Sequence, residues 1–334
     1  MSTDAVLREL LVRQLDHWLP GALHRSRRAT LALAYAGDAG TAEAALRVVA
    51  GYADRLRGRR LTVLVLAGGG PDLPARLGPV EATLPADVAV HVVPGAPSRL
   101  PVALKAAGAA GAPLLTVADG PDPASAVLAA AATGRPAELL LTAEAPAAFR
   151  AALETAGFRL ATEVELVPAD GSPARVVAFG TTLDKSLEAF KDALWEVDER
   201  AGVRYRDRTD PAGALLDITP QPDPGPLRRE LQAELLRSGP RTLTELRRHT
   251  ATATAYRAAD TVAALTDLLV TGVVRRDPVD GRLGGDVVIS AATEPIAVPS
   301  ADLTPGTCPA SRTAAPAGRP GAPSPGSSRT SDRS

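Results

Sequence analysis

Short apolar runs alternate with helical segments through the first half of the chain, and this alternation limits the possible folds most. The runs, such as LTVLVLA and AELLLTA, are apolar at nearly every position. Strands of this kind are buried on both faces, as in a parallel sheet between two layers of helices. We therefore expect an α/β fold with strands at 29–36, 61–67, 88–94, 113–119 and 137–143, and helices at 41–57, 99–109, 122–133 and 146–157.

The end of this half breaks the alternation. Two runs, 161–167 and 174–180, are joined by a short turn containing Asp170-Gly171, and glycine tolerates the positive φ that a tight hairpin turn needs. Five strands with crossover helices and then an antiparallel pair is the order of class I S-adenosylmethionine methyltransferases. We predict a seven-strand, methyltransferase-like (Rossmann-type) sheet, preceded by an amphipathic helix over 4–19 that Pro20-Gly21 ends.

A second pattern follows a loop rich in proline and aspartate. Three helical segments and a strand–turn–strand segment succeed one another, which is typical of a winged helix-turn-helix. Thr242 or Thr244 is placed to begin the second of these helices, and Glu245 is placed for a capping box with Thr242. The predicted organisation is a sheet domain over 1–207, a linker over 208–225, a winged helix over 226–290 and a disordered tail over 291–334.

Composition excludes several classes of function. The chain has 334 residues, a formal net charge of −1 and one cysteine, Cys308, so an internal disulfide and a thiolate zinc cluster are excluded. The four histidines show no metal-binding spacing. No run approaches the roughly 20 apolar residues of a membrane span, and the N-terminus lacks a signal-peptide pattern. We expect a cytoplasmic protein that binds no metal and no membrane.

The turn after the first strand is the candidate cofactor site. Glycines let the backbone approach a nucleotide, and the following helix offers free N–H groups, so Gly37, Asp38 and Gly40 are candidate S-adenosylmethionine contacts. Carboxylates at the ends of the first two strands, the usual acceptors for this cofactor, are missing. The turn is therefore either a surviving pocket or a structural connection, and we expect S-adenosylmethionine to bind weakly or not at all.

Asp119 is the candidate catalytic residue, because it ends the fourth strand at the edge where α/β folds place chemistry. The alternative is that Asp119-Gly120-Pro121 forms only a turn.

Six arginines are candidate contacts to duplex DNA. A recognition helix reads the major groove while the wing contacts the DNA backbone. Residues 226–290 hold ten arginines and eight acidic residues, so the alternative is a winged helix that binds a partner protein. The candidates are Arg247, Arg248, Arg257, Arg275, Arg276 and Arg282.

Four segments carry a resemblance to a known family: VRQLDHWLPGAL, LALAYAGDAG, LLTVADG and VVAFGTTLDKSLEAFKDALWEVDERAGVRYRD. In this order they resemble the three-Cys-motif partner protein family, TcmP, over roughly residues 5–290. Leu33 stands where the family's first motif has aspartate, Asp38-Ala39 replaces its Pro-Gly, and Gly120-Pro121 replaces a later Pro-Phe. The residues that fall on the family's motifs are Trp18, Gly37, Asp119, Gly180, Lys191, Trp195 and Asp198.

The helix expected over 183–200 contains the best-kept motif. Leu187, Phe190 and Leu194 share a helical stripe, and Trp195 lies at its edge. We interpret Phe190, Trp195 and Asp198 as an interdomain signature that packs the last strand of the sheet against the winged helix.

Three hypotheses of function follow. The first, implied by the resemblance, is a degenerate methyltransferase-fold domain coupled to a winged helix that binds nucleic acid or a partner protein. The second is an active S-adenosylmethionine-dependent methyltransferase. The third is a transcriptional regulator whose α/β domain senses a small molecule.

Overall fold

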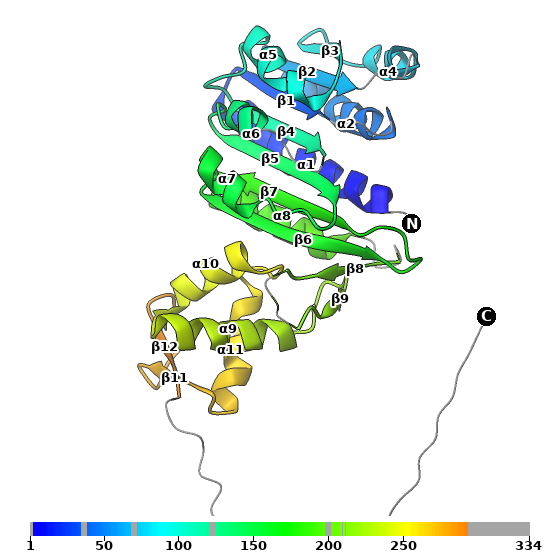
Figure 1. Ribbon diagram of the computed structural model, residues 1–334. Coiled ribbons are helices and arrows are strands. Elements are labelled where there is room, and N and C mark those ends of the chain that lie inside the picture. The colour runs from blue at the N-terminus through cyan, green and yellow to red at the C-terminus, as the bar shows by residue number, and fades with distance from the viewer. Residues whose placement is uncertain are drawn as a thin grey trace, which may run out of the picture. The chain divides into compact units, whose positions relative to one another are not determined.

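The computed structural model describes residues 3–34, 39–67, 72–120, 125–197, 202–208, 210 and 212–292. These residues belong to one compact unit, Met1–Thr293, whose elements are labelled in Figure 1. All but the first two residues of the expected tail lie outside the described part, so its disorder stays a prediction. The same holds for the boundaries proposed between the sheet domain, linker and winged helix.

Among the described residues, nine strands form one sheet in the order β3-β2-β1-β4-β5-β7-β6-β8-β9. β1 to β5 run parallel to their neighbours, and every pairing from β5–β7 onward is antiparallel. The first seven strands have the predicted methyltransferase order, but the number seven is wrong. The strands are β1 (Arg28–Ala34), β2 (Arg60–Ala67), β3 (Val88–Pro94), β4 (Leu114–Asp119), β5 (Ala137–Glu144), β6 (Leu160–Pro168), β7 (Arg175–Thr181), β8 (Val203–Arg206) and β9 (Leu215–Asp217).

Helices cover both faces of the sheet (Figure 1). One layer holds α1, α2, α4 and α8, and the other holds α5, α6 and α7. Successive strand residues point to opposite faces, so Leu31 and Leu33 of β1 pack under the α1 layer while Ala32 and Ala34 pack under α5. The helices are α1 (Thr3–Arg25), α2 (Ala39–Gly51), α3 (Ala53–Leu56), α4 (Leu73–Glu81), the 3₁₀ turn Pro97–Arg99, α5 (Leu100–Ala106), α6 (Ser125–Ala131), α7 (Arg150–Ala156) and α8 (Asp184–Glu196).

α1 continues through Pro20 to Arg25, so the predicted helix end at Pro20-Gly21 is wrong. Proline has no N–H and leaves the carbonyl four residues earlier without its helical donor. That carbonyl belongs to Asp16, and the Tyr52 hydroxyl donates a hydrogen bond to it at 3.1 Å. A side chain from a neighbouring element thus replaces the missing hydrogen bond, which a reading of local sequence does not anticipate.

The described part of the chain ends in a group of three helices and a small sheet, which we call the C-terminal group (residues 225–291). The predicted capping box of the second helix is confirmed. Thr242 Oγ1 accepts from the Glu245 amide at 3.2 Å, and the Thr242 amide donates to Glu245 Oε2 at 2.8 Å. The elements are α9 (Gly225–Ser238), β10 (Arg241–Thr242), α10 (Leu243–Ala253), α11 (Asp260–Val270), β11 (Val274–Asp277) and β12 (Val288–Ala291), with strand order β10-β12-β11.

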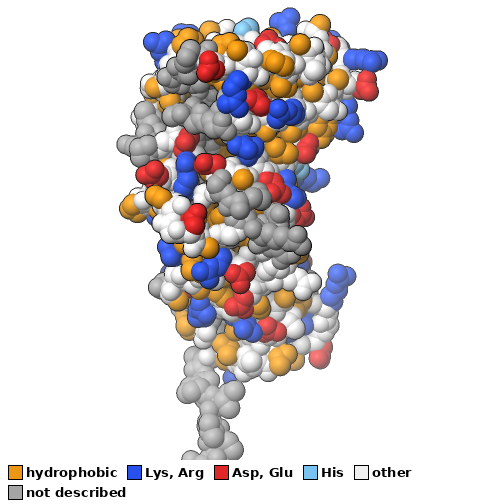
Figure 2. Space-filling model, turned by 90° about the vertical axis from the view of Figure 1, so that its right-hand side faces the viewer, with side chains coloured by type: hydrophobic (Ala, Val, Ile, Leu, Met, Phe, Trp, Pro, Cys, Tyr) orange, Lys and Arg blue, Asp and Glu red, His pale blue; other side chains and the backbone are white. Residues whose placement is uncertain are grey.

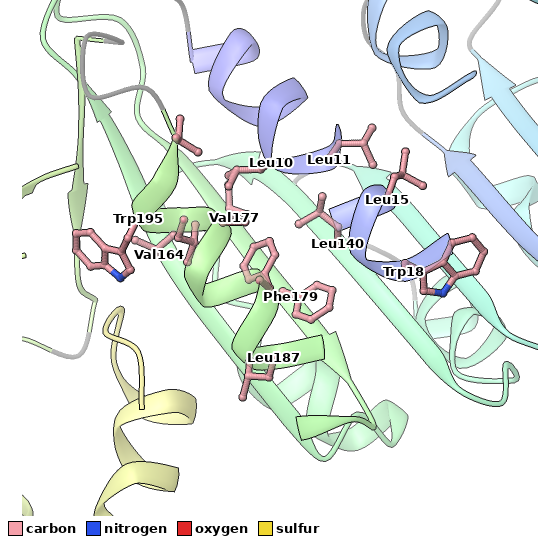
Figure 3. Packing of buried hydrophobic residues seen from close by; sticks show 14 of the residues in the cluster. Leu10, Leu11, Leu15, Trp18, Leu140, Val164, Val177, Phe179, Leu187 and Trp195 are labelled. Atoms are coloured by element: carbon pink, nitrogen blue, oxygen red, sulfur yellow. The ribbon is translucent and has the colours of Figure 1, made fainter. Parts of the chain in front are cut away.

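α8 contacts both the sheet and the C-terminal group. Its Phe190 ring stacks on Phe179 of β7, with centroids 4.5 Å apart and planes at 17°. Trp195, one turn farther along the helix, is fully buried, and its Nε1 donates to the Ala255 carbonyl at 3.2 Å. Figure 3 shows Trp195 set apart from Phe179, on the side of the pale-yellow helix of the C-terminal group. One helix therefore packs on both parts of the chain.

We expect Trp195→Ala to lower the free energy of unfolding by about 3–5 kcal/mol, the usual range for truncating a buried aromatic side chain. Trp195→Phe keeps most of the packing and removes the hydrogen bond to Ala255, so its loss should be smaller. Urea denaturation of the full chain measures both values. A change below about 1 kcal/mol for Trp195→Ala, which is typical of surface positions, would contradict this packing role.

Candidate functional site

Three strands bring polar side chains together at the carboxyl edge of the parallel strands. Asp119 ends β4 and pairs in register with Thr142 of β5. β7 runs the opposite way, so its first residue, Arg175, reaches the same edge opposite Glu144. The fold therefore places a carboxylate, a hydroxyl and a guanidinium side by side where α/β folds usually bind ligands.

The Asp119 carboxylate is already occupied by two donors. Arg175 Nη2 lies 2.6 Å from Asp119 Oδ1, and the Thr142 hydroxyl donates to the same oxygen at 2.8 Å. Arg175 also lies 3.8 Å from Asp4 of α1. The side chains of Arg175 and Asp119 are only 20% and 26% exposed, so solvent screens their attraction partly. A substrate would have to compete with these contacts to reach Asp119.

These side chains line a small cavity between α1 and the sheet. Its volume is about 190 Å³, and Leu7, Leu11, Val117 and Leu140 form its apolar wall. Pockets that hold drug-sized ligands usually measure about 300–1,000 Å³. Within the described residues, the cavity suits a small polar group better than a whole nucleoside cofactor.

The described end of the candidate cofactor turn lies next to a residue that lines the same cavity. Gly37 and Asp38 lie outside the described residues, while Gly40 lies in the first turn of α2 and the adjacent Thr41 lines the cavity. Sequence reasoning missed Arg175 and Thr142. The register of the β6–β7 hairpin could have placed Arg175 at the edge, because the first residue of an antiparallel strand lies beside the last residues of its parallel neighbours.

The six candidate DNA-contacting arginines differ in their surroundings. Arg257 donates to both Asp260 oxygens and to the Pro220 carbonyl. Arg276 donates to four backbone carbonyls of the β11–β12 connection. Both guanidiniums therefore stabilise the loops around them.

The other four arginines form two pairs. Arg247 and Arg248 line a cavity of about 320 Å³ whose α8 wall carries Asp184 and Glu188. Arg275 and Arg282 are exposed on the strand–turn–strand segment. The six side chains therefore differ in how far contacts within the chain occupy them.

The face seen in Figure 2 is the right-hand side of Figure 1, toward which the parallel strands run. On its described part, Lys/Arg and Asp/Glu side chains are interspersed. A surface that binds polyanions usually gathers positive charge instead.

One residue of the predicted interdomain signature, Trp195, lies at a buried contact that we call the α8 junction: Lys191, Trp195 and Tyr205 with Thr254 and Ala255. The Lys191 amine donates to the Thr254 carbonyl, and the Tyr205 hydroxyl donates to the Leu194 carbonyl at 2.6 Å. The Trp195 ring meets Tyr205 edge-on and lies 5.7 Å from the Tyr256 ring. Asp198, the third signature residue, lies outside the described residues.

Lys191 is the most strongly perturbed group of this junction. Its side chain is 1% exposed. Burial lowers the pKa of Lys191 to about 7, and the Asp207 carboxylate partly opposes that shift. Asp207 also accepts from the Ala255 amide at 2.7 Å, so it orders the same loop that Lys191 contacts.

Among the described residues, no three His, Cys, Asp or Glu side chains lie close enough together to hold a metal ion. None of the described helices has the length and apolar character needed to cross a membrane.

Comparisons with known proteins give no family. No protein-family model matches the sequence, and no curated protein matches it. Solved structures give weak likenesses. Phosphoethanolamine N-methyltransferase 1 of Haemonchus contortus is 11% identical with a TM-score of 0.32, covering 46% of this chain and 37% of its own.

Two tRNA methyltransferases are similarly distant. The putative enzyme of Streptococcus pneumoniae is 14% identical, covers 75% of this chain and 97% of its own, and has a TM-score of 0.29. TrmK of B. subtilis is 13% identical, covers 78% and 93%, and has a TM-score of 0.30. The strand order of the sheet, rather than these likenesses, makes the fold methyltransferase-like.

We expect Lys191 to make stability depend on pH between about pH 7 and pH 9. In this range the unfolded chain holds the Lys191 proton and the folded chain does not, because the folded pKa is lowered to about 7. The free energy of unfolding should therefore rise with pH, by up to about 1.4 kcal/mol per unit, and this slope should disappear below the folded pKa, where both states hold the proton. Denaturation of wild type and Lys191→Met at several pH values isolates this slope.

Lys185→Met is the matched control, because Lys185 is exposed on the same helix. It should keep the wild-type slope, whereas Lys191→Met should lose it. Equal slopes for wild type and Lys191→Met would contradict a lowered Lys191 pKa.

Proposed function

We propose that this protein is a methyltransferase-fold protein that does not transfer methyl groups. In this proposal its C-terminal group is a winged helix, held against the sheet by α8, that binds a partner protein. The resemblance to the TcmP family implies the same arrangement of a sheet domain, a signature helix and a winged-helix-like segment.

The contacts of Asp119 carry the first half of the proposal. The carboxylate that would face a methyl acceptor instead accepts from Arg175 at 2.6 Å and from Thr142 at 2.8 Å, inside a cavity of about 190 Å³. The sequence also has Leu33 where the family's first motif has a carboxylate. An ion pair in the place of the substrate favours a structural role for this edge.

The chemistry of the C-terminal group favours a protein partner over duplex DNA. The order helix, strand, helix, helix, strand, strand is that of a winged helix, which would make α11 the recognition helix. α11 carries Asp260 and Asp267 and no lysine or arginine. Arg257, which precedes it, is bound to Asp260. Asp267 is likewise bound to Arg228, so the groove-facing helix offers DNA phosphates no unpaired arginine.

The α8 junction supports a fixed connection between the two parts. Trp195 and Lys191 both donate to the 254–255 backbone from buried positions. A movement of the C-terminal group on partner binding would therefore be transmitted to the sheet through α8, because no flexible joint separates them at this contact.

Two titrations of the full chain test the proposal. Calorimetry with S-adenosylmethionine should give no binding in the micromolar range, and fluorescence anisotropy with duplex DNA at low salt should give no change. Arg175→Met frees Asp119 from the guanidinium, so a gain of S-adenosylmethionine affinity in this variant would support the view that the ion pair closes the site.

Other outcomes would assign other functions. Micromolar S-adenosylmethionine binding by wild type that Gly40→Trp abolishes would favour the active methyltransferase. DNA binding that Arg275→Gln and Arg282→Gln weaken would favour a winged helix that binds nucleic acid. If a small molecule also changed that DNA affinity, the transcriptional regulator would be favoured.

A further inference from the structure

The face of β2 and β3 that points toward α5 is only partly covered. β3 is an edge strand, and α5 spans only Leu100–Ala106. Two cavities lie along this face, one of about 530 Å³ and one of about 650 Å³. His91 and Ala107 line both cavities, so the two adjoin. We call them together the β2–β3 groove.

One half of the groove is basic because of the strand register. β1 begins at Arg28, which follows Arg27, and β2 begins at Arg60, which follows Arg59. Arg28 and Arg60 are paired in register. The Arg60 amide donates to the Arg27 carbonyl at 2.7 Å, which holds the two arginine pairs side by side. Arg27, Arg59 and Arg60 line the larger cavity, where Asp87 is the only carboxylate among the lining residues.

The guanidiniums of this half are not equally engaged. Arg28 donates to the carbonyls of Gly108 and Ala110, and Arg59 donates to the Ser26 carbonyl at 3.2 Å. Arg27 and Arg60 are exposed, and within the described part of the chain neither forms a side-chain hydrogen bond or ion pair. Three arginines and one carboxylate line this cavity, so it carries an excess of positive charge that an anion could offset.

The other half of the groove is mostly aliphatic, and its one arginine, Arg99, donates to the Pro94 carbonyl at 3.1 Å. Leu64 and Val93 come from the strands, and Val102, Ala103 and Ala106 come from α5. Val102 is 72% exposed, so it adds apolar surface that a ligand could cover. No aromatic ring other than the His91 imidazole lines this half, so it offers little surface on which a nucleobase could stack.

We propose that the β2–β3 groove binds one amphiphilic anion, an alkyl or acyl chain that carries a phosphate group. The chain lies along Val102 and Ala106 of α5, and the phosphate lies between Arg27 and Arg60. Guanidiniums pair with phosphate oxygens through two parallel hydrogen bonds, and burial of the chain releases water from apolar surface. The phosphate end of this site, at Arg27 and Arg60, lies at the opposite end of the strands from Asp119, and the site does not depend on the proposed function.

Calorimetric titration of the full chain with dodecyl phosphate, below its critical micelle concentration, tests the proposal. We expect saturable binding to wild type. Arg27→Gln with Arg60→Gln should weaken it by about tenfold to a hundredfold, the effect of losing hydrogen bonds to a charged group. Ala106→Trp should weaken it as well, because this exposed position can fill the apolar half without entering the core.

Three controls identify the ligand chemistry. Arg275→Gln with Arg282→Gln removes the same charge from another exposed site and should leave binding unchanged. Dodecyltrimethylammonium has the same chain with the opposite charge and should not bind. Adenosine monophosphate has a phosphate without an alkyl chain and should bind more weakly than dodecyl phosphate.

Several results would overturn the proposal. One is the absence of saturable dodecyl phosphate binding. Others are dodecyltrimethylammonium binding as tightly as dodecyl phosphate, or adenosine monophosphate binding more tightly. The last is a loss of affinity in the Arg275 and Arg282 variant equal to that in the Arg27 and Arg60 variant. Circular dichroism of each variant checks folding. Because the two groove variants act on separate halves, misfolding of one leaves the other informative.

Discussion

Two buried hydrogen bonds from α8 to the backbone of Thr254 and Ala255 hold the C-terminal group in place. Their donors, Lys191 and Trp195, are four residues apart and therefore lie on one side of the helix. Burying an amine is costly unless it loses its proton or finds partners, and Lys191 has both a lowered pKa and an acceptor in the Thr254 carbonyl. The lowered pKa allows a neutral amine, which can still donate to the Thr254 carbonyl.

The position of α8 is fixed in turn by its other contacts. Phe190 stacks on Phe179 of β7, and Ser186 donates to Glu138 of β5 at 2.6 Å. Gln14 of α1 donates to the other Glu138 oxygen at 2.7 Å, and burial raises the pKa of Glu138. α1, β5 and α8 thus share one buried polar group. A displacement of α8 would disturb the core of the sheet as well as the C-terminal group.

The long apolar strands could be predicted from sequence because each is buried on both faces and is therefore apolar at nearly every position. β8 and β9 could not, because they have four and three residues and alternate between buried and exposed side chains. Val203 and Tyr205 are buried while Arg204 is exposed. In a chain rich in arginine, such a short alternation also occurs in loops, so it does not identify a strand. The helix through Pro20 depends on Tyr52, a residue far away in sequence.

The candidate sites divide in the same way. Asp119 could be placed from its strand, and Trp195 from its helical position. Their partners could not, because Arg175 and Ala255 reach them through tertiary contacts. The arginines of the β2–β3 groove are visible in the sequence as two Arg-Arg pairs. Only the pairing of Arg28 with Arg60 shows that these pairs are neighbours.

Hydrogen exchange at the Ala255 amide tests the central claim, that α8 joins the C-terminal group rigidly to the sheet. This amide is buried and donates to Asp207 Oδ2 at 2.7 Å. If the junction is as described, the amide should exchange as slowly as the amides of Phe179 and Ala178 in β7, because both would open only with the unit. Exchange at the rate of an exposed loop, with β7 still protected, would show that the C-terminal group detaches on its own and would contradict the account.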